Sequence, residues 1–203
     1  MSTATKASPP CVICAGGSAT IDQIFLVDEV KLPSVKITAT DFVETGGGMG
    51  ANAAVAVQRL GGRAIYWGRV GDDETGDQVI ALLKHEGIDV STVLRLSGFR
   101  TKIATILIDA RGERLVVSVQ PQGYPPDASW LPIERVDDAD AVRADTRWPP
   151  GAQRPSASSL RPSTNRRWRR ASNARARRAS TSSNTATNRS PVNVVSAART
   201  WSR

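Results

Sequence analysis

A glycine-rich turn that leads directly into an alanine-rich helix constrains this chain more than any other feature. The stretch reads GGGMGANAAVAVQRLGGRAIYWGRVG over residues 46–71. Four glycines in five positions allow a backbone to approach a ligand closely, because no Cβ stands in the way and positive φ costs little. Asn52 lies on the first turn of the expected helix, 51–60, where its amide can reach a polar ligand. Together with the strand-like segment after the helix, the pattern predicts βαβ units and a parallel sheet.

The turn carries neither of the common phosphate-binding fingerprints. No GxxxxGK[ST] sequence occurs, and Ala51 and Ala53 interrupt both alignments of GxGxxG. The alternative interpretation is an ordinary strand-to-helix turn without a ligand.

The spacing of small residues through this stretch resembles the first signature of the PfkB or ribokinase-like family of carbohydrate kinases. The positions that match are Gly47, Gly48, Gly50, Asn52, Ala54, Gly61 and Gly71. In that family the Gly-Gly pair and the Asn contact sugar hydroxyls, so the resemblance implies that Gly47, Gly48 and Asn52 bind a sugar. It also implies an α/β fold with a ribokinase-like parallel sheet flanked by helices and a small β lid, truncated at the C-terminus.

The GxxxxD run that ends at Asp22 also resembles the family, where this carboxylate lies at the end of the first strand against the sugar hydroxyls. The resemblance makes Asp22 a sugar ligand, with Thr20 as its neighbour on the same strand face. The alternative role for an Asp at this point is to cap a turn.

A weak strand over 139–144 places Asp145 at its carboxyl end, where open α/β sheets bind ligands. The phrases ADTRWPPGA and PPDASWLP resemble the sulfofructose kinase branch of the family. That resemblance implies that Arg147 and Lys36 help to bind the anionic end of a sugar phosphate or sulfonate. The small-molecule partner is then a sugar or one of these sugar anions.

Two β-rich regions predict the lid. In the second, two strand-like runs flank Asp109-Ala-Arg-Gly112, which predicts a hairpin with Gly112 at positive φ. In ribokinase-like enzymes such strands cover the sugar and often form a dimer contact. The resemblance therefore implies lid strands within 22–45 and 101–120, and a homodimer through the lid.

The two cysteines form a CxxC, but the run CVIC at 11–14 is typical of a buried strand, in which residues three apart point to opposite faces. A redox pair needs a helix N-terminus to activate a thiol. A zinc site needs a second ligand pair, and the only histidine, His85, lies far along the chain. We therefore expect Cys11 and Cys14 to be inert core residues.

Charge divides the chain sharply. Residues 1–145 hold 14 basic and 19 acidic residues, a net charge of −5, whereas residues 146–203 hold 13 Arg and no acid, a net charge of +13. The segment 152–203 shows neither helical nor strand periodicity, so it buries too little apolar surface to offset the entropy of ordering its backbone. We expect it to be disordered or poorly packed, and residues 1–10 to be disordered. No apolar run is long enough to span a bilayer, and no signal peptide is evident, which predicts a soluble cytoplasmic protein without membrane contact.

The family resemblance implies ATP and Mg²⁺, with an Asp base and a phosphate-stabilising helix N-terminus in a second, Asp-Thr-x-Gly-Ala-Gly-Asp-like loop. No such loop occurs in the sequence, so no catalytic, cofactor-binding or metal residue is predicted. We therefore expect the sugar-binding part of an ATP-dependent sugar kinase, over 11–151, that is inactive as written. The abrupt change to Arg-rich, acid-free sequence suggests a frameshift, a hypothesis that the nucleotide sequence tests.

Two other functions remain open from the sequence. The Arg-rich run over 166–178 favours binding of nucleic acid by counterion release, with Trp168 stacking on a base. Such runs usually bind polyanions weakly and without sequence preference. The second alternative is a sugar-binding module without catalysis.

Overall fold

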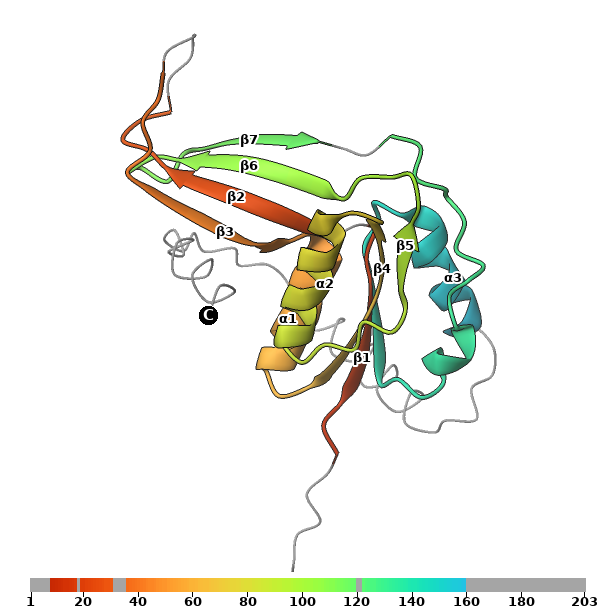
Figure 1. Ribbon diagram of the computed structural model, residues 1–203. Helices are drawn as coiled ribbons and strands as arrows, with labels where there is room; N and C mark the ends of the chain where they lie inside the picture. Colours follow the sequence, from red (N-terminus) through yellow and green to blue (C-terminus); the bar gives the residue numbers. More distant parts are fainter. Residues whose placement is uncertain (1–7, 18, 31–35, 120–121, 160–203) are drawn as a thin grey trace, which may run out of the picture.

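The computed structural model describes residues 8–17, 19–30, 36–119 and 122–159. A central four-stranded sheet carries helices on both faces, and a second four-stranded sheet lies across one end of it (Figure 1). The sequence-based expectations for residues 1–7 and for the Arg-rich run, Trp168 included, fall outside the described residues. No helix within the described ranges is long and apolar enough to cross a membrane.

The central sheet is entirely parallel, as the sequence predicts. Its strands are β1 (Cys11–Ala15), β4 (Arg63–Gly71), β5 (Val93–Leu96) and β8 (Ala141–Ala144), in the order β5-β4-β1-β8. The inner strands β1 and β4 are almost entirely buried, because elements cover both faces of the sheet. The weak strand that was expected over 139–144 is two residues shorter.

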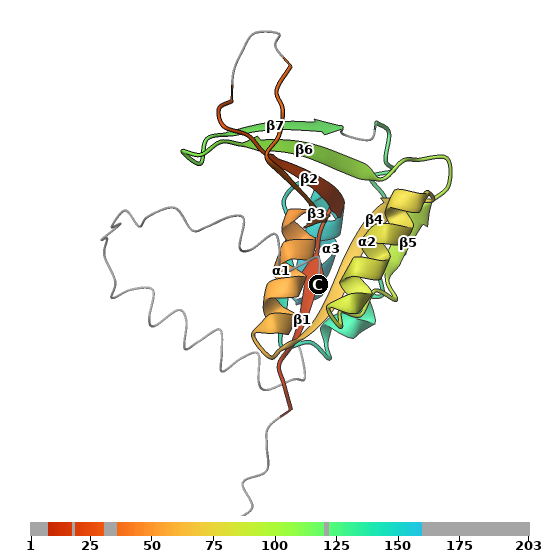
Figure 2. The ribbon, with the colours of Figure 1, turned by 60° about the vertical axis from the view of Figure 1, so that its left-hand side comes forward.

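The helices fall on opposite faces of this sheet (Figures 1 and 2). On one face α1 (Met49–Arg59) and α2 (Glu74–His85) bury Ala54, Val79 and Leu83 together with Tyr66 of β4. On the other, the short 3-10 helix η1 (Ile133–Val136) and the region before α3 (Pro149–Ser159) cover Trp67. Two apolar cores therefore share one sheet.

The two cysteines lie in different cores, as the strand pattern predicts. Cys14 packs on the α1 and α2 side and Cys11 on the opposite side, and both thiols are free and buried. Burial raises the pKa of Cys14 to about 11, although Arg143 opposes the shift. A thiol with so high a pKa is almost entirely protonated at neutral pH, which fits an inert core residue.

The second sheet is the predicted lid. Its strands are β2 (Thr20–Leu26), β3 (Asp41–Gly47), β6 (Lys102–Ile108) and β7 (Arg114–Val119), in the order β3-β2-β6-β7. Strands β6 and β7 form the expected antiparallel hairpin, and Gly112 has φ 84°. The first lid region extends slightly beyond 22–45, since Thr20 pairs with Gly47.

The glycine-rich turn is shorter than the sequence suggests. Gly46 and Gly47 belong to β3, where they pair with Ile21 and Thr20, and helix α1 begins at Met49 instead of residue 51. Only Gly48 makes the turn, with φ 99° at the N-cap. Gly46 and Gly47 extend the strand because pairing with β2 satisfies the hydrogen-bonding groups of their backbone.

The expectation of disorder from residue 152 is wrong for 152–159, which continue α3. Prolines at the first positions of a helix remove only N–H groups that have no helical partner. Further on, Pro155 is buried, and a Cβ at Gly151 would lie 2.0 Å from Cε3 of Trp148, so that indole packs flat on the helix backbone. Docking on the second core stabilises a segment whose own pattern does not indicate a helix.

Asp73 joins helix α2 to the lid, and its removal is expected to destabilise both. Its carboxylate accepts hydrogen bonds from the Gly76 N–H at 2.9 Å, the Thr101 N–H at 2.8 Å and the Thr101 hydroxyl at 2.5 Å. Asp73→Ala should lower the free energy of unfolding by about 1–3 kcal/mol in urea titrations, because the cap is lost and the Thr101 groups are left unpaired. Asp72→Ala, at an exposed neighbour with only a surface ion pair, should change it by less than about 0.5 kcal/mol.

The pH dependence of this stabilisation follows from the same contacts. Desolvation raises the pKa of Asp73, but the hydrogen bonds from Thr101 and Gly76 outweigh it and hold the pKa below its usual range. The contribution is therefore complete above the unfolded pKa of about 3.9 and disappears as the pH falls through the lower folded value. Equal acid sensitivity of the parent chain and Asp73→Ala would contradict this role.

Candidate functional site

The inner end of the lid carries the carboxylate that the sequence singles out. Thr20 and Asp22 lie on the same face of β2, and the Thr20 hydroxyl donates to Oδ1 of Asp22 at 2.7 Å. Gly47 lies opposite Thr20 on β3. A Cβ at Gly47 would lie 2.2 Å from Oδ2 of Asp22 and 2.5 Å from Oγ1 of Thr20, so only glycine leaves room for this pair.

Lys102 faces the same region from the neighbouring strand. It pairs in parallel register with Thr20, so its side chain shares the face that carries Thr20 and Asp22. Burial raises the pKa of Asp22, and the hydrogen bond from Thr20 and the positive charge of Lys102 oppose that shift. The lid therefore offers a half-buried carboxylate beside a buried ammonium group.

A cavity of about 310 Å³ lies where the lid meets the carboxyl ends of the central strands. Gly17 follows β1, Arg69 lies near the end of β4 and Asp145 follows β8, and all three line this cavity. Lys102 and Gly48 line it from the lid side. In open α/β sheets this edge is where ligands bind, so we take the cavity and the adjoining face of the lid as the candidate site.

Arg69 is the most deeply buried cation of the cavity. Its guanidinium carbon lies 4.3 Å from the ring centre of Trp148 and 5.4 Å from that of Tyr124, and one of its N–H groups donates to the Pro125 carbonyl. The side chain is 6% exposed, and desolvation lowers its pKa. The two aromatic rings hold the guanidinium in place without neutralising it.

Asp145 occupies the position that the sequence predicts for it. It is buried just after β8, where its N–H donates to the Ala15 carbonyl at 2.8 Å and its Oδ1 accepts from the Arg147 N–H at 2.9 Å. Arg147 also lines the cavity, with an exposed side chain. The structure thus brings both residues to the candidate site.

Two of the sequence-predicted residues lie elsewhere. Lys36 is exposed and precedes Asp41, which pairs with Leu26 at the end of β2 opposite to Thr20, so Lys36 lies at the outer end of the lid. Asn52 is on the first turn of α1, as predicted, but it is exposed and does not line the cavity. The roles of both residues stay predictions.

Several residues that line the cavity were not predicted from the sequence, although two of them have a sequence feature that could have identified them. Arg69 is a charge inside the run from Ala64 to Gly71, whose other residues are apolar or glycine, and Lys102 opens a β-rich run. Tyr124 and Trp148 gave no comparable signal, because they reach the site only through loops.

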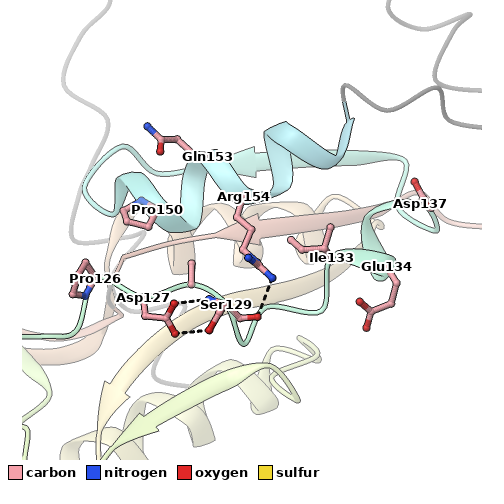
Figure 3. A pocket seen from close by; sticks show the side chains of 10 residues that line it. Pro126, Asp127, Ser129, Ile133, Glu134, Asp137, Pro150, Gln153 and Arg154 are labelled. Atoms are coloured by element: carbon pink, nitrogen blue, oxygen red, sulfur yellow. Dashed lines mark hydrogen bonds between the residues drawn. The ribbon is translucent and has the colours of Figure 1, made fainter.

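A second and larger cavity, of about 1080 Å³, lies between α3 and the segment before η1 (Figure 3). Two of its charged groups are engaged with Ser129: Asp127 accepts hydrogen bonds from the Ser129 N–H and hydroxyl at 2.9 and 2.6 Å, and Arg154 donates to the Ser129 carbonyl at 3.0 Å. It lies beside the sheet and away from the Asp22 carboxylate, so we favour the smaller cavity for chemistry.

Within the described ranges, no three His, Cys, Asp or Glu side chains gather closely enough to hold an ion. The described residues therefore form no cage of protein ligands for an ion.

Comparison with known families decides the lineage. The model for the pfkB family of carbohydrate kinases matches residues 12–164. The chain belongs to that family. The match includes the Asp22 strand, the glycine turn and the whole lid of this pfkB-family chain.

Individual relatives agree with the assignment. Fructokinase-1 of Zea mays is 39% identical over 103 residues, which are 51% of this chain and 31% of that protein. A crystal structure assigned as a ribokinase from Agrobacterium tumefaciens is 38% identical, with a TM-score of 0.66 over 70% of this chain and 46% of that one. The ribokinase of Cryptococcus neoformans in complex with ADP is 30% identical, with a TM-score of 0.51 over 60% of this chain and 38% of that one. The pfkB-family chain thus spans about a third of the length of the curated relatives that it matches.

Proposed function

We propose that this chain is the sugar-binding part of a carbohydrate kinase whose acceptor is a ketohexose of the fructose type. The observation that carries the proposal is the fit between Asp22 and Gly47, which reserves space for one half-buried carboxylate on the lid face that Lys102 shares with the cavity. A carboxylate accepts hydrogen bonds from two neighbouring hydroxyls, and these bonds are stronger than those between neutral groups. The relatedness to fructokinases supports a ketohexose as the acceptor.

The residues of the site would hold and orient this acceptor. Asp22 binds hydroxyl groups, Thr20 fixes the direction of the carboxylate, and Gly47 and Gly48 let the backbone approach the sugar. Asp145 offers a second carboxylate from the central sheet. Orientation of this kind contributes much of the acceleration in reactions that join two substrates.

The phosphoryl group would come from ATP, in keeping with the family and with the ADP complex of the Cryptococcus ribokinase. The sequence of this chain contains no Gly-Ala-Gly-Asp loop, so we assign neither the base nor a nucleotide site to its residues. We expect the chain as given to bind the sugar and not to phosphorylate it.

Replacing Asp22 by Asn is expected to weaken the binding of fructose about tenfold in isothermal titration calorimetry. The amide keeps the shape of the carboxylate but loses its charge and one acceptor oxygen, and bonds to charged groups are the stronger ones. Asp28→Asn, at an exposed position shortly after the same strand, is the matched control and should leave the affinity unchanged.

The pH dependence gives this prediction a second measurement. Because burial raises the pKa of Asp22, its carboxylate becomes protonated at a higher pH than an exposed aspartate. The affinity of the parent chain should fall as the pH drops through that raised value, while Asp22→Asn shows no such transition. A folded chain that binds none of fructose, ribose or their phosphates would refute the proposed function.

A further inference from the structure

The hydroxyl group of Tyr66 is a buried donor without an acceptor. Tyr66 lies on β4 and is fully buried, and its hydroxyl oxygen has no hydrogen-bond partner among the residues that the structure describes. A buried hydroxyl without a partner costs free energy, whereas a phenylalanine ring would fill the same core position without that cost. A partner in another state of the protein would explain why a tyrosine occupies this position.

Three glycines surround the hydroxyl. A Cβ at Gly68, two residues further along β4, would lie 2.4 Å from the Tyr66 oxygen, and a Cβ at Gly16, just after β1, would lie 3.1 Å from it. Helix α1 packs against the same point, since a Cβ at Gly50 would lie 2.6 Å from the Cα of Gly16. The phenol thus extends over Gly68 and Gly16, toward the carboxyl ends of the strands.

Asp145 lies in the same row of residues as the two strand glycines. The registers of β1 with β4 and with β8 place Gly16 between Gly68 and Asp145, one residue beyond the last pairs of the two ladders. Residues two apart on a strand share a face, so this row lies on the face that carries Tyr66. The row therefore brings a carboxylate of the candidate site to the side of the sheet where the phenol ends.

The electrostatics of the phenol agree with this placement. Burial raises the pKa of Tyr66 above its ordinary value, and the negative charge of Asp145 is the largest of the charge effects that act on it. The positive charge of Arg69 opposes the rise, and Cys14 adds to it. The phenol stays protonated at neutral pH and so remains a donor, and a donor bonds more strongly to a carboxylate than to a neutral acceptor.

Asp145 has an oxygen that can accept this bond. Its Oδ1 accepts from the Arg147 N–H at 2.9 Å, and no group in the described ranges donates to its Oδ2. No hydrogen bond joins Asp145 to the Tyr66 hydroxyl in this structure. A donor and an acceptor of the same site are therefore both unsatisfied on one face of the sheet.

We propose that Tyr66 is a positioning residue of the sugar site, whose hydroxyl donates to Asp145 when the sugar is bound. The inference rests on the proposed function, because Asp145 is taken to hold a hydroxyl of the acceptor. The carboxylate turns about its side-chain bonds, so that the sugar holds one oxygen from the cavity and the phenol holds the other from the sheet. A carboxylate fixed from both sides keeps one orientation, and such ordering by the protein increases affinity.

Replacing Tyr66 by Phe tests this role, because the change removes the hydroxyl and keeps the ring. In isothermal titration calorimetry of the full 203-residue chain, Tyr66→Phe is expected to weaken the binding of fructose about tenfold, the loss of one hydrogen bond to a charged group. The urea midpoint of the sugar-free chain should stay the same or rise, because the hydroxyl has no partner in that state. Thr40→Val, which removes an exposed hydroxyl at the outer end of the lid, is the matched control and should leave the affinity unchanged.

A double-mutant cycle separates positioning of Asp145 from packing of the core. In the background of Asp145→Ala, which retains Asp22 for binding, the same Tyr66→Phe change should weaken the binding of fructose less than about twofold, because the acceptor of the hydrogen bond is absent. A merely structural role of Tyr66 would give the same loss in both backgrounds, and that result would overturn the inference.

Circular dichroism of each variant shows that it is folded before its affinity is compared. Equal affinity of the parent chain and Tyr66→Phe for fructose would overturn the inference and leave the proposed function intact. A lower urea midpoint of sugar-free Tyr66→Phe would do the same, since the hydroxyl would then have a partner in the empty protein. A folded parent chain that binds no sugar would overturn both.

Discussion

Gly47→Ala is expected to weaken sugar binding about 100-fold or more. The new methyl group would lie 2.2 Å from Oδ2 of Asp22, far inside van der Waals contact, so the carboxylate has to leave its position. The hydroxyl contacts of a charged group are then lost, and a hundredfold change in affinity corresponds to about 2.7 kcal/mol. Titration with fructose or fructose 6-phosphate measures the effect.

The clash between the new methyl group and the Asp22 carboxylate should also lower stability, and a double variant with Asp22→Ala is the control. Forcing an extra methyl group into filled space should lower the free energy of unfolding by about 1–3 kcal/mol. In the background of Asp22→Ala, the same Gly47→Ala change should cost less, because the carboxylate that it strikes is absent. Two changes in contact are not additive, whereas independent ones are. Strict additivity, or a Gly47→Ala chain that binds the sugar normally, would rule out the fit between these two residues.

Leu83→Ala is expected to cause a large loss of stability. Leu83 is fully buried on α2, where it packs in the core with Val79 and Tyr66. Removing its side chain leaves a cavity between the helix and the sheet, which should lower the free energy of unfolding by about 2–5 kcal/mol. Because natural domains are stable by only about 5–15 kcal/mol, urea denaturation should show a clearly lower midpoint.

The matched control is Leu60→Ala, which makes the same chemical change at the end of α1. Leu60 is 88% exposed, so its truncation should change the free energy of unfolding by less than about 0.5 kcal/mol. Similar effects of the two substitutions would mean that α2 does not pack on the sheet as described.

The segments whose order could be predicted are those with a strong local pattern. The apolar run CVIC predicts a buried strand, and the Asp109–Gly112 turn predicts a hairpin; the structure contains both. The helix at 149–159 was missed because its stability comes from contact with Trp148 and not from its own periodicity. Tertiary packing commonly overrides weak local preference in this way.

The residues of the candidate site also fall into two groups, those that local sequence predicts and those that only the tertiary structure brings together. The placing of Gly47 and Asp145 was predictable because one lies in a spaced glycine pattern and the other follows a strand, and those features are local in sequence. Asp22 came from the family resemblance, which implied the end of the first strand, whereas the structure has it as the third residue of β2. The cations Arg69 and Lys102 were not predictable, because they meet only when β4 of the central sheet and β6 of the lid reach the same cavity. Lys36 was expected at the site and lies at the outer end of the lid, because the β2–β3 register carries it away from Thr20.

Local sequence therefore accounts for the parallel sheet, the lid strands and the family of this chain, since hydrophobic period and glycine spacing act within a few residues. The charge of the binding cavity depends on strand order and on the parallel register between β2 and β6, which join residues up to about eighty positions apart. Side chains so distant in sequence influence one another only after the fold has excluded water between them, as it does for the buried Arg69 and Lys102.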